Sequence, residues 1–228
     1  MKLSEEMKNK TLLSFELFPP KTEKGLQNLP GTIDHLMKYN PSYISCTYGA
    51  GGGNVGANRE VCQMIKNAGT TPVTHFTVIK NTKEGIKEQL DQYLVDGVDH
   101  MLALRGDIPL GETTTCGDFD YATDLVKFVR DTYGDKFEIA VAGSPEGHIS
   151  CRSLESDIAV LKQKQDNGAD YIMTQLCWDM EQFKYWLDAI RKAGITMPVD
   201  VGVMPILDQA ATINMALSRN GCVMDREL

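Results

Sequence analysis

Seven short, mainly apolar segments recur along the chain, and most are rich in the β-branched and aromatic residues typical of strands. They cover residues 12–18, 43–48, 72–79, 100–104, 137–142, 171–176 and 198–205. Continuous apolar runs indicate parallel strands that are covered on both faces. The segments start about 27 to 37 residues apart, close to the roughly 31 residues per unit of an eight-fold βα barrel.

Helical periodicity fills the stretches between these segments. In residues 83–96 the apolar side chains recur at helical spacing, and Gly97 follows at the position of a left-handed cap. Residues 154–161 repeat the pattern, with Gly168 as the stop. Because strand and helix alternate in this way, we expect parallel strands joined by crossover helices.

These elements predict an α/β fold of the (β/α)8 TIM-barrel family with about seven βα units. A doubly wound open sheet would give the same local signals, but seven units without a break in composition favour the barrel. No eighth strand is predicted after Pro205, so we expect a C-terminally incomplete barrel. Residues 1–228 are interpreted as a single catalytic domain.

Composition and charge narrow the class further. The chain is 42% hydrophobic, which excludes a disordered protein, and its net charge of −8 disfavours nucleic acid or an acidic membrane as partner. No apolar run approaches the roughly 18 residues of a membrane span, and residues 1–10 lack the apolar core of a signal peptide. The six cysteines form no C-x-x-C pair. We therefore expect a cytoplasmic protein with reduced thiols.

Polar residues at the strand ends are the candidates for chemistry, because barrel enzymes carry their active sites there. Glu16 lies among apolar residues at the end of the first segment, where burial would raise its pKa and make it a general acid. An ion pair with an Arg or Lys is the structural alternative. His75 lies inside the third segment, where a hydrogen-bonded core histidine is the more frequent interpretation.

Two further strand ends combine glycine with polar groups. Gly51, Gly53 and Gly56 match G-x-G-x-x-G after the second segment, but the acidic residue of a dinucleotide site about 20 positions on is missing. We interpret this stretch as a flexible loop. Arg105 and Asp107 are expected to project to the same side of the fourth strand as ligand contacts, or else to form a structural pair.

Gln175, at the end of the sixth segment, offers a donor and an acceptor that suit a heterocycle; a hydrogen bond to a neighbouring loop is the alternative. No nucleophile elbow, G-K-[ST] or H-x-x-x-H motif is present, so hydrolases, kinases and zinc enzymes lack their minimum parts. The residues alone predict a barrel that binds a polar, planar ligand and carries one carboxylate acid.

Four strand-end motifs nevertheless resemble one family. FELFPPK at 15–21, SCTYGA at 45–50, LRGD at 104–107 and TQ at 174–175 are together similar to the bacterial, flavin-dependent methylenetetrahydrofolate reductases. The resemblance covers essentially the whole chain. It implies FAD as cofactor, NADH or NADPH as reductant, and a folate substrate that is reduced from 5,10-methylenetetrahydrofolate to 5-methyltetrahydrofolate by ping-pong hydride transfer, in one-carbon metabolism and methionine biosynthesis.

The resemblance also implies roles for individual residues. Glu16 looks like the proton donor to N10 of the folate, Asp107 like the aspartate beside flavin and pterin, and Gln175 like the glutamine that contacts nicotinamide and folate in turn. The positions that match FAD contacts are Thr47, Tyr48, Ala50, His75, Arg105, Gly106, Asp107, Tyr121, Ala122, His148, Asp157 and Lys164. No metal site is expected.

Three hypotheses follow. The first is an enzyme of this family, as a homo-oligomer or with a partner covering the open edge of the barrel. The second is a non-catalytic flavin- or folate-binding subunit to which a partner supplies the missing segment. The third, an unrelated barrel such as an aldolase, needs a Schiff-base lysine at a strand end, and none of the seven segments offers one.

Overall fold

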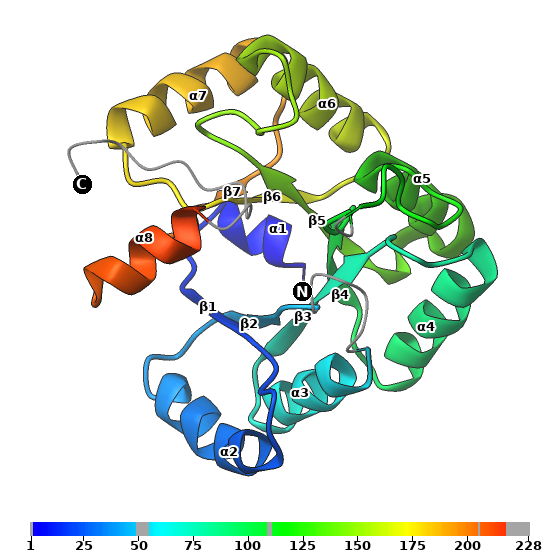
Figure 1. Cartoon of the computed structure of the whole chain (residues 1–228), viewed down its shortest axis with the longest axis vertical. Helices are drawn as coiled ribbons and strands as arrows, with labels where there is room; N and C mark the ends of the chain where they lie inside the picture. The colour runs from blue at the N-terminus through cyan, green and yellow to red at the C-terminus, as the bar shows by residue number, and fades with distance from the viewer. Residues whose placement is uncertain (1, 49–54, 109–110, 205, 218–228) are drawn as a thin grey trace. The chain divides into compact units, whose positions relative to one another are not determined.

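The computed structural model describes residues 2–48, 55–108, 111–204 and 206–217 (Figure 1). The chain divides into two compact units, Met1–Ala140 and Val141–Leu228. Strands and helices alternate through both, and the strands are neighbours in chain order. The interpretation of residues 1–228 as one domain stays a prediction.

The first unit contains four complete parallel strands and the helices that connect them. Its elements are α1 (Leu3–Met7), β1 (Ser14–Leu17), α2 (Glu23–Met37), β2 (Tyr43–Cys46), α3 (Val55–Asn67), β3 (Thr71–Thr77), α4 (Lys83–Val95), β4 (His100–Leu104), α5 (Ala122–Tyr133) and the 3-10 turn η1 (Gly134–Lys136). Strand β5 (Glu138–Gly143) begins here and ends in the second unit. The register pairs Glu16 with Ser45, Ser45 with Val73, and His75 with Leu102.

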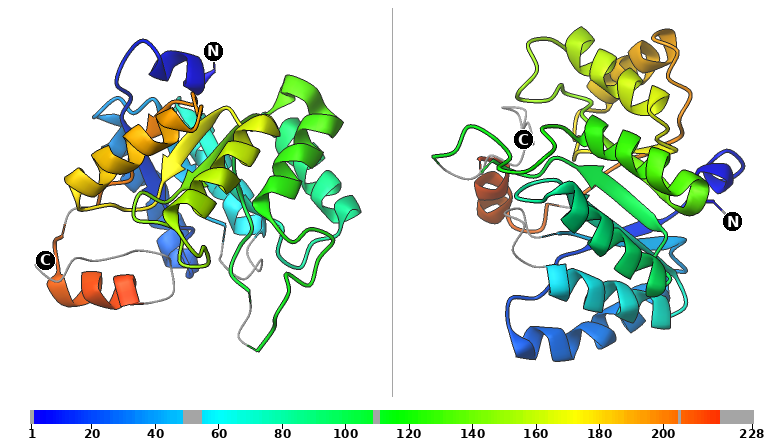
Figure 2. Two further views of the ribbon diagram at one scale, coloured as in Figure 1. Left: turned by 90° about the horizontal axis from the view of Figure 1, so that it is seen from above. Right: turned by 90° about the vertical axis from the view of Figure 1, so that its right-hand side faces the viewer.

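The second unit continues from β5 with two further strands. It contains α6 (Leu154–Asp166), β6 (Tyr171–Thr174), α7 (Met180–Lys192), β7 (Val199–Asp200) and α8 (Gln209–Leu217). Strands β6 and β7 are parallel, with Ile172 opposite Val199, and α6 packs beside α7 (Figure 2). After β7, the described residues 201–204 and 206–217 contain α8 and no strand.

The predicted α/β fold is confirmed, although several strands are shorter than the apolar segments suggested. Each of the seven segments overlaps a strand, but β1 has four residues and β7 only two. Residue 205, the predicted end of the last strand, lies outside the described residues. The predicted helix stops are confirmed as well, because Gly97 and Gly168 adopt positive φ angles of 70° and 103°.

Local sequence signals explain where several helices begin. Thr22, Thr82 and Ser153 each accept a hydrogen bond from the backbone N–H three residues ahead, and Asp179 accepts two, from residues 181 and 182. These side chains satisfy backbone donors that the first turn of a helix leaves without partners. The helix starts therefore follow from Ser, Thr and Asp placed just before each apolar repeat.

The core of the first unit lies between its strands and the helices α3 and α4 (Figure 1). Phe76 of β3 packs against the rings of Tyr48 and Tyr93, with centroids 5.6 and 6.3 Å away, and all three residues are buried. Side chains at alternate positions of a strand point to opposite faces. Phe76 faces the helices, so its neighbours His75 and Thr77 face the opposite side of the sheet.

A buried charge cluster ties α1 to the amino ends of β4 and β5. The Glu138 carboxylate accepts hydrogen bonds from the backbone N–H groups of Leu3 and Ser4, each at 2.7 Å. It also lies 3.0 Å from Nε2 of His100, whose Nδ1 meets Asp99 at 2.7 Å. Burial alone would raise the pKa of Glu138, but these contacts lower it to about 2. Burial alone would lower the pKa of His100, and its two carboxylates raise it to about 9.

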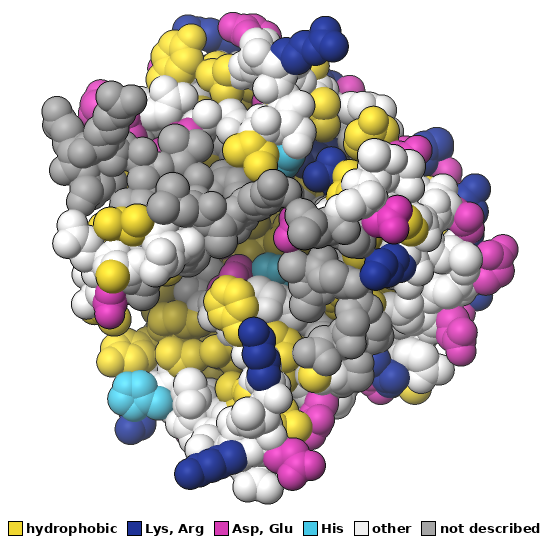
Figure 3. Space-filling view, in the orientation of Figure 1, with side chains coloured by type: hydrophobic (Ala, Val, Ile, Leu, Met, Phe, Trp, Pro, Cys, Tyr) yellow, Lys and Arg dark blue, Asp and Glu magenta, His cyan; other side chains and the backbone are white. Residues whose placement is uncertain are grey.

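Surface features are ordinary apart from one apolar region near β1. Leu13, Phe18 and Tyr39 are large, exposed apolar side chains close to β1 and the end of α2, where Figure 3 shows apolar side chains gathered.

Among the described residues, none of the helices is long and apolar enough to cross a membrane. The five described cysteines are free thiols, as expected, and Cys222 lies outside the described residues.

Candidate functional site

The Glu16 carboxyl and the His75 imidazole meet at the carboxyl-terminal half of the strands. Oε2 of Glu16 lies 3.6 Å from Nε2 of His75, and within the described part of the chain this imidazole is the basic group at ion-pair distance from Glu16. The Glu16 side chain is 46% exposed and that of His75 only 8%. Glu16 is thus less enclosed than its apolar neighbours in the sequence suggested.

Burial shifts both groups toward their neutral forms. It raises the pKa of Glu16, as predicted, and lowers the pKa of His75 to about 4. The exposed fraction and the raised pKa of Glu16 agree if protein surrounds the carboxyl on most sides while solvent reaches it from one. A carboxylic acid in that position keeps its proton to a higher pH than an exposed one and can still be reached by a substrate.

The strand register explains why these two side chains meet. The ring of Phe15 packs against Tyr39 just after α2, so Glu16 points to the other face of β1. Strand β2, between β1 and β3, places the small side chain of Ser45 opposite Glu16. A small residue on the intervening strand leaves room for Glu16 to approach His75.

Strand β3 also carries two buried polar atoms that have no partner among the described residues. They are Nε2 of His75 and Oγ1 of Thr77, two positions apart on the same face. Buried polar atoms in proteins almost always have a hydrogen-bond partner, so such atoms mark places where a ligand or water is expected. Thr77 was not among the predicted site residues.

The loop after β4 corrects one expectation. The strand ends at Leu104, so Arg105 and Asp107 do not lie on one side of a strand as predicted. The chain turns at Gly106, whose φ is 86°, and a Cβ there would come within 3.1 Å of Thr77. Asp107 is exposed, Arg105 is half-buried, and its Nε donates to the Gly106 carbonyl oxygen at 3.3 Å.

The end of β2 carries the predicted FAD contacts Thr47, Tyr48 and Ala50. The backbone N–H of Thr47 donates to the Leu17 carbonyl oxygen at 2.9 Å, which ties this end to β1. Tyr48 is buried, and its hydroxyl donates to Gln89 of α4 at 2.7 Å; burial raises its pKa to about 12. The Tyr48 side chain therefore packs under the helices. Ala50 lies outside the described residues.

The predicted glycine loop and the predicted FAD contact Tyr121 both lie next to the start of a helix. Of the predicted glycine loop, residues 51 and 53 lie outside the described residues, whereas Gly56 is the second residue of α3. Tyr121 precedes α5 and its side chain is 62% exposed. Its backbone N–H donates to the Asp124 carboxylate at 2.9 Å, which fixes the start of the helix at Ala122.

In the second unit, Gln175 follows β6 and is half-buried. Its backbone N–H donates to the Gly143 carbonyl oxygen at 2.8 Å, which joins β6 to the end of β5. Its side-chain Oε1 accepts a hydrogen bond from the backbone N–H of Leu176 at 2.9 Å. The amide oxygen thus makes a hydrogen bond within the turn after β6. This resembles the alternative stated from the sequence, in which Gln175 makes a hydrogen bond to a neighbouring loop.

The remaining predicted residues of this unit surround the loop between β5 and α6. Nζ of Lys164 donates to the Ala142 carbonyl oxygen at 2.9 Å, and burial lowers the pKa of Lys164. Asp157 accepts from the Cys151 thiol at 3.5 Å. The exposed His148 and the half-buried Cys151 line a hollow of about 320 Å³ whose other lining residues are Glu146, Gly147, Ile149, Ser153, Leu154 and Gln182.

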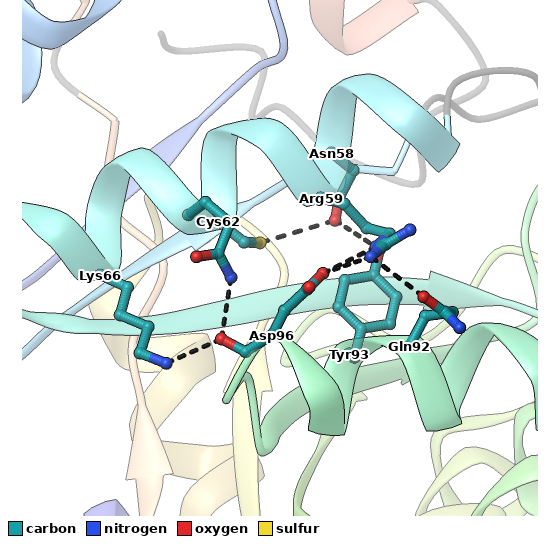
Figure 4. A network of polar contacts seen from close by, with 8 residues as sticks. Asn58, Arg59, Cys62, Lys66, Gln92, Tyr93 and Asp96 are labelled. Carbon is teal, nitrogen blue, oxygen red and sulfur yellow. Dashed lines mark hydrogen bonds and ion pairs between the residues drawn. The ribbon is translucent and has the colours of Figure 1, made fainter.

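Sequence reasoning missed a buried amide that organises the first unit. Asn58 of α3 is fully buried, and its Nδ2 donates to the carbonyl oxygens of Cys46 and Thr47 at 3.0 and 3.1 Å. Its Oδ1 accepts from the hydroxyl of Thr74 at 2.8 Å and from that of Tyr93 at 2.7 Å. Figure 4 shows Asn58 beside Tyr93. An uncharged polar residue on the apolar face of a predicted helix was the available signal.

The next turns of α3 hold the end of α4. Arg59 contacts the Asp96 carboxylate through Nε at 2.8 Å and through a second guanidinium nitrogen at 2.6 Å (Figure 4). Gln63 and Lys66 both donate to the Asp96 carbonyl oxygen, at 2.9 and 2.7 Å. Positive side chains near the last carbonyls of a helix are favourable because they complement its dipole.

The residues present fit a flavin, judged by their chemistry. The first unit offers the buried hydroxyl of Thr77 on β3, which has no partner among the described residues, and the positive φ of Gly106 lets the backbone come close to Thr77. The second unit offers Lys164, a partly desolvated cation suited to a phosphate. Among the described residues, no cluster of three or more His, Cys, Asp and Glu side chains could hold a metal ion.

The strands follow one another in chain order and are joined by crossover helices, which defines a fold of the βα-barrel class. Polar side chains lie at the carboxyl ends of the strands, where enzymes of this class carry their active sites. A family model, methylenetetrahydrofolate reductase, matches residues 2–220. The 5,10-methylenetetrahydrofolate reductase of Escherichia coli K12 is 34% identical over 202 residues, which cover 88% of this chain and 67% of that protein. The chain therefore belongs to the methylenetetrahydrofolate reductase family.

Other comparisons agree on family and fold. Methylenetetrahydrofolate reductase (NADH) 1 of Arabidopsis thaliana is 38% identical over 219 residues; the match covers 90% of this chain, but the chain spans only 37% of the plant protein. A solved structure of a Clostridium thermocellum protein that binds two copies of 5-methyl-5,6,7,8-tetrahydrofolic acid is 14% identical with a TM-score of 0.63, covering 89% of this chain and 69% of that one. A 2,3-dimethylmalate lyase is 12% identical with a TM-score of 0.59, covering 99% and 88%. These two structures support the fold alone.

Proposed function

We propose that the protein reduces 5,10-methylenetetrahydrofolate to 5-methyltetrahydrofolate, with FAD as cofactor and NADH or NADPH as reductant in a ping-pong sequence. Family membership supports the reaction class. The observation that carries the proposal is the Glu16 carboxyl, an accessible acid whose pKa burial raises, at the carboxyl end of a parallel strand. The names of the plant relatives specify NADH.

Glu16 is the residue proposed to hold and deliver the proton. Ring opening of the folate requires protonation of N10, which turns the departing amine into a good leaving group. A carboxylic acid with an ordinary pKa is almost fully ionised at pH 7, whereas a raised pKa keeps more of the protonated form available. FAD, when bound, supplies the hydride transfer between nicotinamide and folate.

The other proposed residues bind and orient. Asp107, exposed just after β4, is proposed to stabilise positive charge that develops on the folate. Gln175 is proposed to present its amide to nicotinamide and folate in turn. Arg105 and His148 are proposed, with Lys164, as positive contacts for the diphosphate of the cofactor in a chain whose net charge is −8.

The biological setting is proposed on the same basis. We place the protein in the cytoplasm, as a homo-oligomer or in complex with a partner chain. Its substrate is a small folate, and neither nucleic acid nor membrane is a proposed partner, because the net charge is negative. Gel filtration with light scattering of the holoprotein measures the assembly directly.

Two half-reactions on purified full-length chain test the proposal. A yellow protein should be bleached anaerobically by NADH or NADPH and then recover its colour on adding 5,10-methylenetetrahydrofolate. Glu16→Gln should keep the bleaching and lose nearly all of the recovery, which should slow by about 10²–10⁴-fold. Glu23→Gln, at the exposed first turn of α2, is the matched control and should keep both.

The outcomes separate the candidate functions. Equal loss of both half-reactions in Glu16→Gln would contradict the role given to Glu16. A protein that binds flavin and folate but shows neither half-reaction would instead be the non-catalytic binding subunit. A colourless preparation that takes up no added FAD would contradict the proposed cofactor.

A further inference from the structure

The unpartnered Nε2 of His75 calls for an explanation within the site. The residue is 6% exposed, its Nε2 has no hydrogen-bond partner among the described residues, and the Glu16 carboxyl oxygen lies 3.6 Å away. This separation is slightly longer than a hydrogen bond. Catalytic hydrogen bonds are often long in the absence of ligand and shorten in the complex with substrate.

The surroundings hold the imidazole in place. His75 lies in the middle of β3, paired through the strand register with Leu102 of β4. The hydroxyl of the preceding Thr74 donates to the buried Asn58 at 2.8 Å, which fixes the helix-facing side of the strand. The small Ser45 on β2 leaves Glu16 room to close the remaining few tenths of an ångström.

We propose that His75 is a positioning residue whose bare Nε2 accepts a hydrogen bond from the protonated Glu16 carboxyl and so aims the acidic proton. This inference rests on the proposed role of Glu16 as the acid. It assigns the neutral imidazole to the tautomer with its proton on Nδ1, because an acid O–H needs an acceptor and Nε2 is the nitrogen that faces it.

The charges around the pair agree with this assignment. An imidazolium at this place would stabilise the carboxylate and lower the pKa of Glu16, yet burial keeps His75 neutral and raises the pKa of Glu16. The nearest titratable group on the neighbouring strand is the thiol of Cys46, whose pKa is raised chiefly by its interaction with Cys62 and by burial, with the Glu16 carboxylate as the smallest cause. Cys46 alternates with Ser45 and therefore points to the opposite face of β2, toward α3.

Nitrogen NMR of the full chain tests the tautomer without relying on activity. The chain contains four histidines, and ¹⁵N-histidine labelling resolves their ring nitrogens. His75→Gln identifies the His75 signals, and His35→Gln, on the exposed surface of α2, serves as the assignment control. At neutral pH the Nε2 of His75 should be bare, and its shift should move toward the free-acceptor value in Glu16→Ala. A proton on Nε2, or a ¹⁵N chemical shift of Nε2 that stays the same in Glu16→Ala, would overturn the proposal.

Kinetics of the holoenzyme then test the positioning role. His75→Leu removes the acceptor at similar volume and should slow reoxidation by the folate about tenfold, the worth of one hydrogen bond near 1.4 kcal/mol. Reduction by NADH or NADPH should slow by a clearly smaller factor, and this split between the two half-reactions is the readout. His75→Gln restores an acceptor near the Nε2 position and should recover most of the folate rate.

A double variant decides between a shared and a separate role. Once Glu16→Gln has removed the acidic proton, adding His75→Leu should cost nothing further, because the two residues act on the same step. Additive losses, or equal losses in both half-reactions as expected for a simple cofactor contact, would overturn the proposal. A wild-type protein that binds no flavin would contradict the proposed function instead, while the NMR result would still decide the hydrogen bond.

Discussion

Replacing Glu138 by Gln should destabilise the protein strongly, although Glu138 lies at the amino ends of the strands and not in the candidate functional site. The wild-type carboxylate is 2% exposed, accepts two backbone N–H bonds from α1 and faces His100. The amide of Gln has one oxygen, so it accepts fewer of these bonds and turns an NH₂ group toward a remaining donor. It also leaves the imidazolium of His100 without its buried counter-charge.

The magnitude follows from the pKa of Glu138 and from the cost of breaking a buried pair. A carboxyl whose pKa falls from 4.5 to about 2 on folding contributes about 3 kcal/mol, and removing one partner of a buried pair costs about 3–5 kcal/mol. These two figures describe the same interaction and are not added. For a chain of 228 residues a loss of 3 kcal/mol lowers the unfolding midpoint by about 6–12 °C.

The cost should depend on pH in a defined direction. The pKa of Glu138 is lowered, so its contribution is present above pH 4.5 and is lost as the pH falls toward 2. The pKa of His100 is raised from 6.5 to about 9, so its contribution is complete below pH 6.5 and is lost as the pH rises through 9. The difference between wild type and Glu138→Gln should therefore be largest between about pH 4.5 and 6.5.

Urea unfolding at pH 5.5 and pH 9.5, followed by circular dichroism, measures both effects. Asp99→Asn is the matched control: its side chain is 59% exposed although it touches the same imidazole, so its loss should cost no more than about 1 kcal/mol. Amide hydrogen exchange at Leu3 and Ser4 should also accelerate in Glu138→Gln. A cost below 1 kcal/mol, or an identical cost at the two pH values, would refute the reasoning.

Three other predictions concern single side chains. Folate reduction should decline as the pH rises through the raised pKa of Glu16, and stopped-flow reoxidation of Glu16→Gln should lack this decline. Gly106→Ala should lose about 1–2 kcal/mol in urea unfolding, because its φ is 86° and the new methyl lies 3.1 Å from a β3 side chain; Gly111→Ala, at φ 92° with open space, isolates the conformational part. Arg59→Leu should cost about 1 kcal/mol by the same assay, through its half-exposed contact with Asp96, and no change would show that the contact is not stabilising.

The order of strands and helices could be predicted because each signal is local. Apolar runs, caps and glycine stops depend on neighbouring residues, and they located every strand and the ends of α4 and α6. The exact strand ends could not be predicted. The predicted segment at 171–176 continues past β6, which ends at Thr174, because Gln175 and Leu176 form the half-buried turn that follows the strand.

The site could be predicted only in part, for a related reason. The embedded position of Glu16 correctly predicted the direction of its pKa shift, but its meeting with His75 depends on register across three strands. The expected alignment of Arg105 with Asp107 assumed strand geometry that stops at Leu104. Asn58 was missed because, apart from Cys62 on its own helix, its partners come from β2 and the residue after it, from β3 and from α4, and no local pattern records them.

The two carbonyl bonds of Asn58 have a consequence for protein engineering. They tie the chain where it leaves β2, at Cys46 and Thr47, to the first turn of α3, so a single buried amide fixes the start of the helix to the end of the strand. A design that transplants β2 together with α3 should therefore keep Asn58, because an apolar residue there would remove the hydrogen-bond partner of two backbone carbonyl oxygens and of the Thr74 and Tyr93 hydroxyls.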